Sequence, residues 1–192
     1  HSIPCGIASA PSLSKAFESS LASDPISAFG GVIAANALVD KVVATLVIEN
    51  FYEVLIAPGY SDEALNLLKS KQNLRVLQIL QDQEGSLELK QILGGFLFQQ
   101  PDRIDQAGDD FKNWKLVAGA GVEKSQIADL SFAWKAVKNI RSNAIVIAKN
   151  QATIGIGMGQ TNRVDSVKSA INRAGDRAKG AVVASDGFFP FT

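Results

Sequence analysis

Residues 143–167 read NAIVIAKNQATIGIGMGQTNRVDSV, and this stretch decides the architecture of the C-terminal half of the chain. The apolar runs 143–149 and 152–157 predict two strands, and Asn150-Gln151 between them predicts a tight hairpin turn. A helix is expected to follow from about residue 162. Glycines stand at positions 155, 157 and 159, and because side chains alternate along a strand, the three share one face.

This glycine pattern excludes the two common phosphate-binding loops. A dinucleotide loop needs G-x-G-x-x-G, and Gln160 stands where its last glycine would fall. A P-loop needs a following Gly-Lys-Ser/Thr, which the stretch lacks. Two interpretations remain. The bare face is either a site of close packing against a helix, or a flat shelf for a planar ligand with Arg163 binding an anion at the helix entrance.

Helices and strands alternate through the rest of the chain, and the order α-β-α-β-α-β in residues 1–80 favours a largely parallel sheet with helices on its faces. Residues 81–123 are polar and turn-rich, which predicts a connector with a hairpin at 88–100 and an extended piece at 114–119. Residues 124–192 are expected to form a second α/β unit. The expected helices span about 11–23, 39–47, 63–71, 124–141 and 162–179, and the other expected strands span 29–36, 52–60, 74–80 and 181–191.

Composition places the chain among ordinary globular α/β proteins, because its 192 residues are 46% hydrophobic and 20% charged. A formal net charge of +0 argues against a non-specific nucleic-acid binder. Cys5 is the one cysteine, which excludes an internal disulfide and indicates a reducing cytoplasm. We expect neither a membrane span nor a signal peptide. The only methionine is Met158, so we expect a piece of a longer protein.

A few residues outside the glycine stretch are candidates for chemistry. His1 is the only histidine and could transfer protons near neutral pH, although a structural role or a tag remnant is the alternative. One histidine and one cysteine do not make a zinc site, and we expect Cys5 to be a buried thiol. Asn143 could cap the preceding helix or support an oxyanion, and Glu53 is most simply solvent-exposed.

Two segments, SDPISAFGG (23–31) and SDGFFPF (185–191), resemble each other. Each places Ser-Asp shortly before a phenylalanine and a glycine or proline. Asp24-Pro25 is typical of a turn, and the phenylalanines could belong to the core. However, Phe188, Phe189 and Phe191 cannot all face inward from one strand, so a loop that carries them could form the wall of a site for a flat aromatic ligand.

These segments, together with HSIPCG (1–6), EVLIAPGY (53–60) and residues 132–164, resemble the AICAR transformylase domain of the bifunctional purine biosynthesis enzymes. The resemblance covers essentially the whole chain. It implies tandem cytidine-deaminase-like three-layer α/β units with mixed or parallel sheets, and a cytoplasmic homodimer whose active sites draw on both subunits. It also implies formyl transfer from 10-formyltetrahydrofolate to the amine of aminoimidazole carboxamide ribonucleotide (AICAR ribonucleotide), without a metal.

The resemblance also implies roles for individual residues. His1 is similar to the family's catalytic histidine, and Asn143 to the asparagine that orients the formyl group. The positions similar to substrate-binding residues are Gly30, Glu53, Arg163 and Phe188, and those similar to folate-binding residues are Ile26, Phe29, Val164, Pro190 and Phe191.

The chain also departs from the family pattern. The lysine expected before His1, the C-terminal histidine and the cyclohydrolase domain all fall outside it, so we expect the isolated chain to be inactive or nearly so. The main alternative is a non-catalytic nucleotide-binding or interaction module of the same fold. A true deaminase is a weaker alternative, because the zinc ligands are missing.

Overall fold

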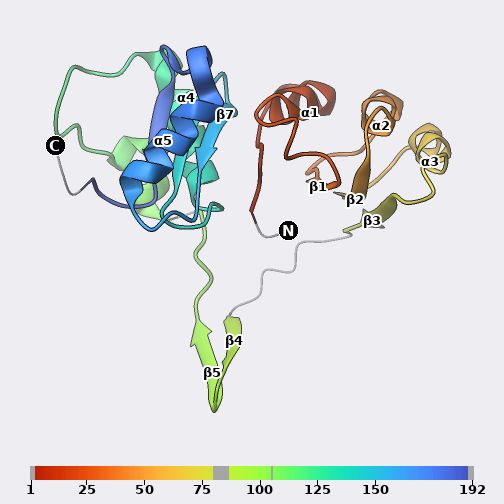
Figure 1. The fold of residues 1–192 in the computed structure, drawn as a ribbon, viewed down its shortest axis with the longest axis horizontal. Helices are drawn as coiled ribbons and strands as arrows, with labels where there is room; N and C mark the ends of the chain where they lie inside the picture. The colour runs from red at the N-terminus through yellow and green to blue at the C-terminus, as the bar shows by residue number, and fades with distance from the viewer. Residues whose placement is uncertain (1–2, 80–86, 105, 190–192) are drawn as a thin grey trace.

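The computed structural model describes residues 3–79, 87–104 and 106–189. It shows an α/β protein with parallel and antiparallel sheets flanked by helices, which confirms the expected class. Figure 1 shows two helix-bearing units side by side and a hairpin that projects away from both. Within the described ranges, every helix is too short or too polar to span a bilayer.

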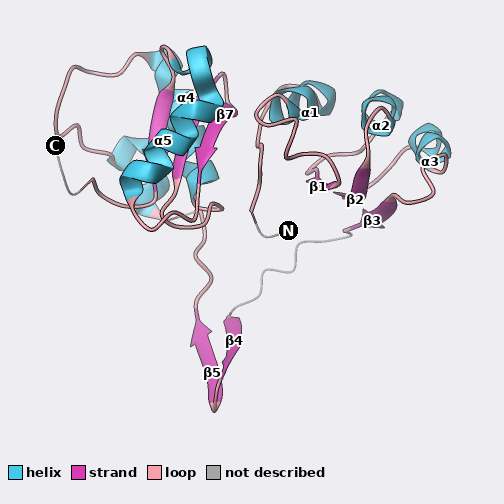
Figure 2. Ribbon diagram, in the orientation of Figure 1, coloured by secondary structure: helices cyan, strands magenta, loops and turns pink. Residues whose placement is uncertain are grey.

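The first unit is a three-stranded parallel sheet in the order β1-β2-β3, with its helices on one face (Figure 2). Leu55 of the central strand is fully buried between sheet and helices, together with Val39 and Val47. Ser61 caps the third helix, as its sequence predicts, because its hydroxyl accepts a hydrogen bond from the Ala64 amide. The elements are α1 (Leu13–Leu21), β1 (Gly31–Ala34), α2 (Lys41–Ile48), β2 (Tyr52–Ala57), α3 (Asp62–Leu68) and β3 (Arg75–Gln78).

The connector contains the expected hairpin, formed by β4 (Glu88–Ile92) and β5 (Gly95–Gln99) in antiparallel pairing. The extended piece expected at 114–119 does not form a strand, although Trp114 has extended backbone angles, φ −78° and ψ 145°. These residues follow two short 3-10 turns, η1 (Ala107–Asp109) and η2 (Phe111–Asn113). Aromatic contacts hold the start of this segment. The Trp114 ring lies edge-on between Phe111 and Trp134, and its indole N–H donates to the Gly108 carbonyl.

The second unit has three layers. Its sheet is antiparallel in the order β7-β6-β8, with α4 against one face and α5 against the other. Alternation along β6 explains the layers, because Val146 and Ala148 face α4 whereas Ile145 and Ile147 face α5. The elements are α4 (Lys124–Val137), β6 (Ile145–Lys149), β7 (Ala152–Gly157), α5 (Arg163–Ala174), η3 (Gly175–Ala178) and β8 (Val182–Ser185).

The glycine face of β7 is a packing surface for α5. A Cβ atom added to Gly155 would lie 2.2 Å from the Ala170 carbonyl oxygen, and one added to Gly157 would lie 1.8 Å from that of Ser166. The close-packing interpretation is therefore confirmed. The ligand shelf is wrong for these two glycines, because the backbone of α5 fills the space where a ligand would lie. Gly159 lies beyond the strand with φ +64°.

Several element ends differ from the predicted ones. The last helix stops at Ala174 rather than near 179, because Gly175 takes φ +53° and ends the α-helical pattern. The predicted hairpin turn at Asn150-Gln151 is confirmed, with φ +54° at both residues. The Asp129 carboxylate accepts hydrogen bonds from both turn amides, at 2.9 and 2.6 Å.

Candidate functional site

Three side chains from separate parts of the second unit converge at one edge of its sheet. Asn143 precedes β6, Arg163 is the first residue of α5, and Asp186 directly follows β8. Antiparallel pairing of β6 with β8 places the start of one strand beside the end of the other, so Asn143 and Asp186 become neighbours. We call Asn143, Arg163 and Asp186 the Arg163 network.

Arg163 holds this network together. Its Nη2 donates to Asn143 Oδ1 at 2.9 Å, and its Nη1 donates to Ser185 Oγ at 2.8 Å and to the Asp186 carboxylate. Asp186 Oδ1 also accepts the backbone amide of Ala144 at 2.9 Å. The guanidinium therefore joins the loop before β6 to the loop after β8 through charge-assisted hydrogen bonds.

The Arg163–Asp186 ion pair is largely withdrawn from water, since the two side chains are 14% and 19% exposed. Burial alone would raise the pKa of Asp186. Hydrogen bonds from Ser142, Arg163 and the Ala144 amide, together with the guanidinium charge, outweigh burial and hold the pKa below its ordinary value of 3.8. Asp186 is therefore a carboxylate at neutral pH and a permanent partner for Arg163.

Asn143 is held at both ends of its carboxamide. Oδ1 accepts from Arg163, and Nδ2 donates to the Gln160 carbonyl at 2.9 Å. A carboxamide nitrogen carries two N–H groups, so one remains for a ligand's oxygen as far as the described residues show. The fixed amide is suited to support a negative charge that develops on such an oxygen.

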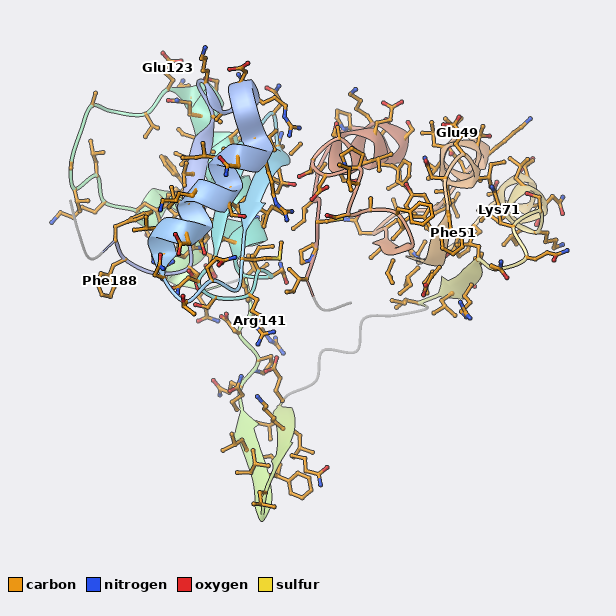
Figure 3. All side chains as sticks on the ribbon, viewed as in Figure 1. Glu49, Phe51, Lys71, Glu123, Arg141 and Phe188 are labelled. Atoms are coloured by element: carbon orange, nitrogen blue, oxygen red, sulfur yellow. The ribbon has the colours of Figure 1, made fainter. Side chains whose placement is uncertain are left out.

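Exposed apolar side chains flank the network. Val164 is 53% exposed and Phe188 is 81% exposed. Figure 3 labels Phe188 near the C-terminal end of the described chain. The loop that carries Phe188 passes tightly over Arg163, because a Cβ added to Gly187 would lie 2.8 Å from the guanidinium Nη2. The structure thus places Asn143, Arg163, Val164 and Phe188 in one region.

A hollow of about 190 Å³ borders the network, and Asp186 contributes to its wall. Trp134 forms another part of the wall and donates its indole N–H to the Asp109 carboxylate at 2.6 Å. Lys138 and Asp102 also line the hollow and form an ion pair, with 3.5 Å between Lys138 Nζ and Asp102 Oδ1. Its mixed charges and its volume suit ordered water or a small polar group.

The other described site residues predicted from the sequence lie in the first unit. Phe29 packs against Phe51 with 5.3 Å between ring centroids, and the Gly30 amide donates to the Phe51 carbonyl. Gly30 has φ +69°, which favours glycine. Ile26 is 88% exposed in the same loop, and Glu53 is exposed on β2.

One copy of the chain does not bring these two groups together. Figure 3 shows Phe51 and Phe188 on opposite sides of the chain. The remaining predicted site residues, His1, Pro190 and Phe191, lie outside the described residues.

Two residues that contact Arg163, Asp186 of the network and its neighbour Ser185, are not among the site residues predicted from the sequence. Asp186 and Ser185 are the Ser-Asp of SDGFFPF, but nothing in that motif indicates that Arg163 is their partner.

Cys5, predicted to be a buried thiol, is only half-buried. Burial, together with the nearby Asp24 carboxylate, raises the pKa of Cys5 above its usual range. In the part of the chain that the structure describes, acidic, histidine and cysteine side chains do not form a group of three able to hold a metal ion.

Comparison with known proteins identifies the family. The chain is 50% identical to the bifunctional purine biosynthesis protein PurH of Cutibacterium acnes over 191 residues and to that of Mycobacterium leprae over 192 residues. It is 48% identical to PurH of Mycobacterium marinum. Each match covers 100% of this chain but only 36–37% of the relative, so the chain spans a little over a third of their length. The family model of the AICARFT/IMPCHase bienzyme matches residues 1–173, and the chain therefore belongs to that family.

Proposed function

We propose that this chain supplies part of the site that transfers a formyl group from 10-formyltetrahydrofolate to the amine of AICAR ribonucleotide in purine biosynthesis. The observation that carries the proposal is the match of the bienzyme family model over residues 1–173, which include Asn143 and Arg163. The geometry of the Arg163 network supports it, because Asn143 keeps one N–H for a ligand oxygen.

The residues suit the chemistry of this reaction. The substrate amine is a poor nucleophile because its lone pair delocalises into the imidazole ring and the carboxamide. The reaction therefore depends on positioning, proton removal and support of the developing oxyanion. In this proposal Asn143 donates to the formyl oxygen, and His1 removes a proton from the attacking amine. Phe188 and Val164 offer apolar surface to the planar ligands.

We also propose that the site forms between two copies of the chain in a homodimer. Phe29 and Gly30 contact Phe51, which Figure 3 shows on the opposite side of the chain from Phe188, so a second copy would be needed to bring the first-unit group (Ile26, Phe29, Gly30 and Glu53) to the Arg163 network. The hairpin supplies apolar surface for such contact, since its leucines and phenylalanines are more than half exposed.

The proposal extends to fold and location. The three layers of the second unit, α4, the sheet and α5, are consistent with the cytidine-deaminase-like architecture, and we propose that the first unit is a related but less complete example. An enzyme that uses these soluble substrates would act in the cytoplasm.

Ligand-dependent thermal stability tests the proposal. Saturating AICAR ribonucleotide should raise the melting temperature, since ligand at 100 times its dissociation constant stabilises the folded state by about 2.7 kcal/mol. Phe188→Ala should reduce the shift, whereas the matched substitution of its exposed neighbour, Phe189→Ala, should leave it intact. Arg163→Ala is a poor test, because it also removes the ion-pair partner of the partly buried Asp186 carboxylate.

A formyl-transfer assay with both substrates completes the test. A chain that binds the nucleotide but does not turn over, even when joined to the rest of a relative's polypeptide, would favour the non-catalytic binding module. A chain that binds neither AICAR ribonucleotide nor 10-formyltetrahydrofolate in that joined form would contradict the proposed function.

A further inference from the structure

The Asp24 side chain stabilises the loop between α1 and β1 through hydrogen bonds within that loop. Asp24 Oδ1 accepts the Ser27 amide at 3.0 Å and Oδ2 accepts the Ser27 hydroxyl at 2.7 Å, which closes a turn under residues 24–27. The Asp24 carbonyl also accepts the Ala28 amide at 3.2 Å. Ile26 and Phe29 project from this loop, 88% and 73% exposed.

The same carboxylate is also held from the second unit. Arg173 lies in the last turn of α5, and its Nη1 donates to Asp24 Oδ2 at 2.6 Å. The Asp24 side chain is only 14% exposed and that of Arg173 is 39% exposed, so the carboxylate end of the pair is shielded from water while the guanidinium end remains exposed. The two residues are 149 positions apart in the chain, so the contact is purely tertiary.

Helix α5 is a rigid support for this contact. Its backbone lies directly on Gly155 and Gly157 of β7, which leaves no room for it to shift toward the sheet. Arg163 begins the helix and Arg173 lies ten residues on, so a rise of 1.5 Å per residue separates their backbones by about 15 Å. One end of α5 therefore carries the Arg163 network, and the other carries the contact to loop 24–30.

Further contacts make the junction specific. Arg177 Nη1 donates to the Ala22 carbonyl at 2.7 Å, and its Nη2 donates to the Ile154 carbonyl at 3.0 Å. Ser23 Oγ lies 3.0 Å from Thr153 Oγ1, and both residues are buried. The end of α1 is thus tied to β7 beside the point where Asp24 meets Arg173.

We infer that Arg173 is a positioning residue, which acts through Asp24 to fix loop 24–30 and its exposed Ile26 and Phe29 in the place from which they bind the folate. The inference rests on the proposed function for the identity of the ligand. The fixing of the loop by Arg173 is a property of the chain without ligand. Without Arg173, the Asp24 carboxylate keeps its contacts inside the loop but loses its tie to α5.

Amide hydrogen exchange on the ligand-free chain tests the positioning itself. Arg173→Ala should speed exchange of the Ser27 and Ala28 amides about three- to tenfold, since it removes a partly shielded ion pair from the loop but leaves the β6 ladder intact. Arg173→Lys should restore most of the protection. Lys168→Ala is the matched control, because Lys168 lies on the same helix in an exposed ion pair with Asp165. Unchanged loop exchange in Arg173→Ala, or an equal rise in β6, would overturn the inference.

Affinity for 10-formyltetrahydrofolate, measured by calorimetry on the chain joined to the rest of a relative's polypeptide, tests the consequence. Arg173→Ala should weaken binding about fivefold or more, and Arg173→Lys should bind like the unaltered chain. If the unaltered chain binds folate and Arg173→Ala binds it equally well, the inference fails while the proposed function stands. If the unaltered chain, joined to the rest of a relative's polypeptide, binds neither folate nor AICAR ribonucleotide, the proposed function fails, and the exchange rates alone decide whether Arg173 positions the loop.

Discussion

At the scale of single residues, the Arg163–Asp186 pair determines how Asn143 is presented. The guanidinium donates to Asn143 on one side and to Asp186 on the other, so removal of either charged partner leaves a partly buried charge without its ion-pair partner. Arg163 remains a predicted nucleotide-binding residue. Its protein contacts indicate that much of its effect would come through Asn143, whose amide it orients.

This pair predicts a pH-dependent stability. Asp186→Asn should lower the free energy of unfolding by about 1–3 kcal/mol at pH 7. The folded-state pKa of Asp186 is lowered, so its contribution is complete above the ordinary value of 3.8 and is lost as the pH falls through the lower folded-state value. Urea unfolding at pH 7 and at several pH values below 4 should therefore show the two stabilities converging in acid.

Asp165→Asn is the control for this experiment. The pKa of Asp165 is also lowered, through hydrogen bonds from Asn162 and Lys168, but its carboxylate is exposed on the surface of α5. The substitution should have little effect on stability at any pH. A constant difference between the unaltered chain and Asp186→Asn down to strongly acidic pH would contradict the role given to the ion pair.

At the scale of secondary-structure elements, α5 and β7 form one packed unit. Gly157→Ala should destabilise the chain by about 2–4 kcal/mol, because a Cβ 1.8 Å from the Ser166 carbonyl oxygen forces the helix off the sheet. Gly121→Ala is the matched control: no atom lies within 4 Å of its added Cβ, and it should change stability by less than about 0.5 kcal/mol. Equal urea midpoints for the two variants would show that α5 does not pack as described.

At the scale of the whole molecule, contacts among the described residues of a single chain do not explain what stabilises the β4–β5 hairpin. Its strands pack chiefly against each other among the described elements, and an isolated two-stranded hairpin is marginally stable in water. The register places Leu89 opposite Phe98 and Gln91 opposite Phe96, so both phenylalanines lie on one face, and each is more than half exposed.

The proposed homodimer predicts that this face is buried between copies. Replacing both Phe96 and Phe98 with Ser should weaken self-association at least about tenfold in sedimentation velocity, since buried aromatic residues contribute strongly to interfaces. Lys90→Ser changes an exposed residue on the opposite face of the hairpin and should leave association unchanged. A chain that sediments as a monomer at all concentrations, or a dimer that tolerates both serines, would contradict this role of the hairpin.

The α/β class, the order of the elements and their local signals follow from the amino-acid sequence alone. Ser61 starts α3, Asn150-Gln151 forms the hairpin turn, and both are predictable because capping and turn chemistry involve residues only a few positions apart. Gly175 shows the limit of this local information, because its positive φ ends α5 five residues before the helical pattern does.

The tertiary structure alone decided what the glycine face is for and which side chains share a site. The bare face of β7 is compatible, by sequence pattern, with either a packed helix or a ligand, and the position of α5 decides for the helix. Arg163 meets Asn143 and Asp186 across 20 and 23 residues, and Arg173 meets Asp24 across 149. Such contacts depend on strand order and on which face each helix covers, and no pattern within one segment of the chain encodes them.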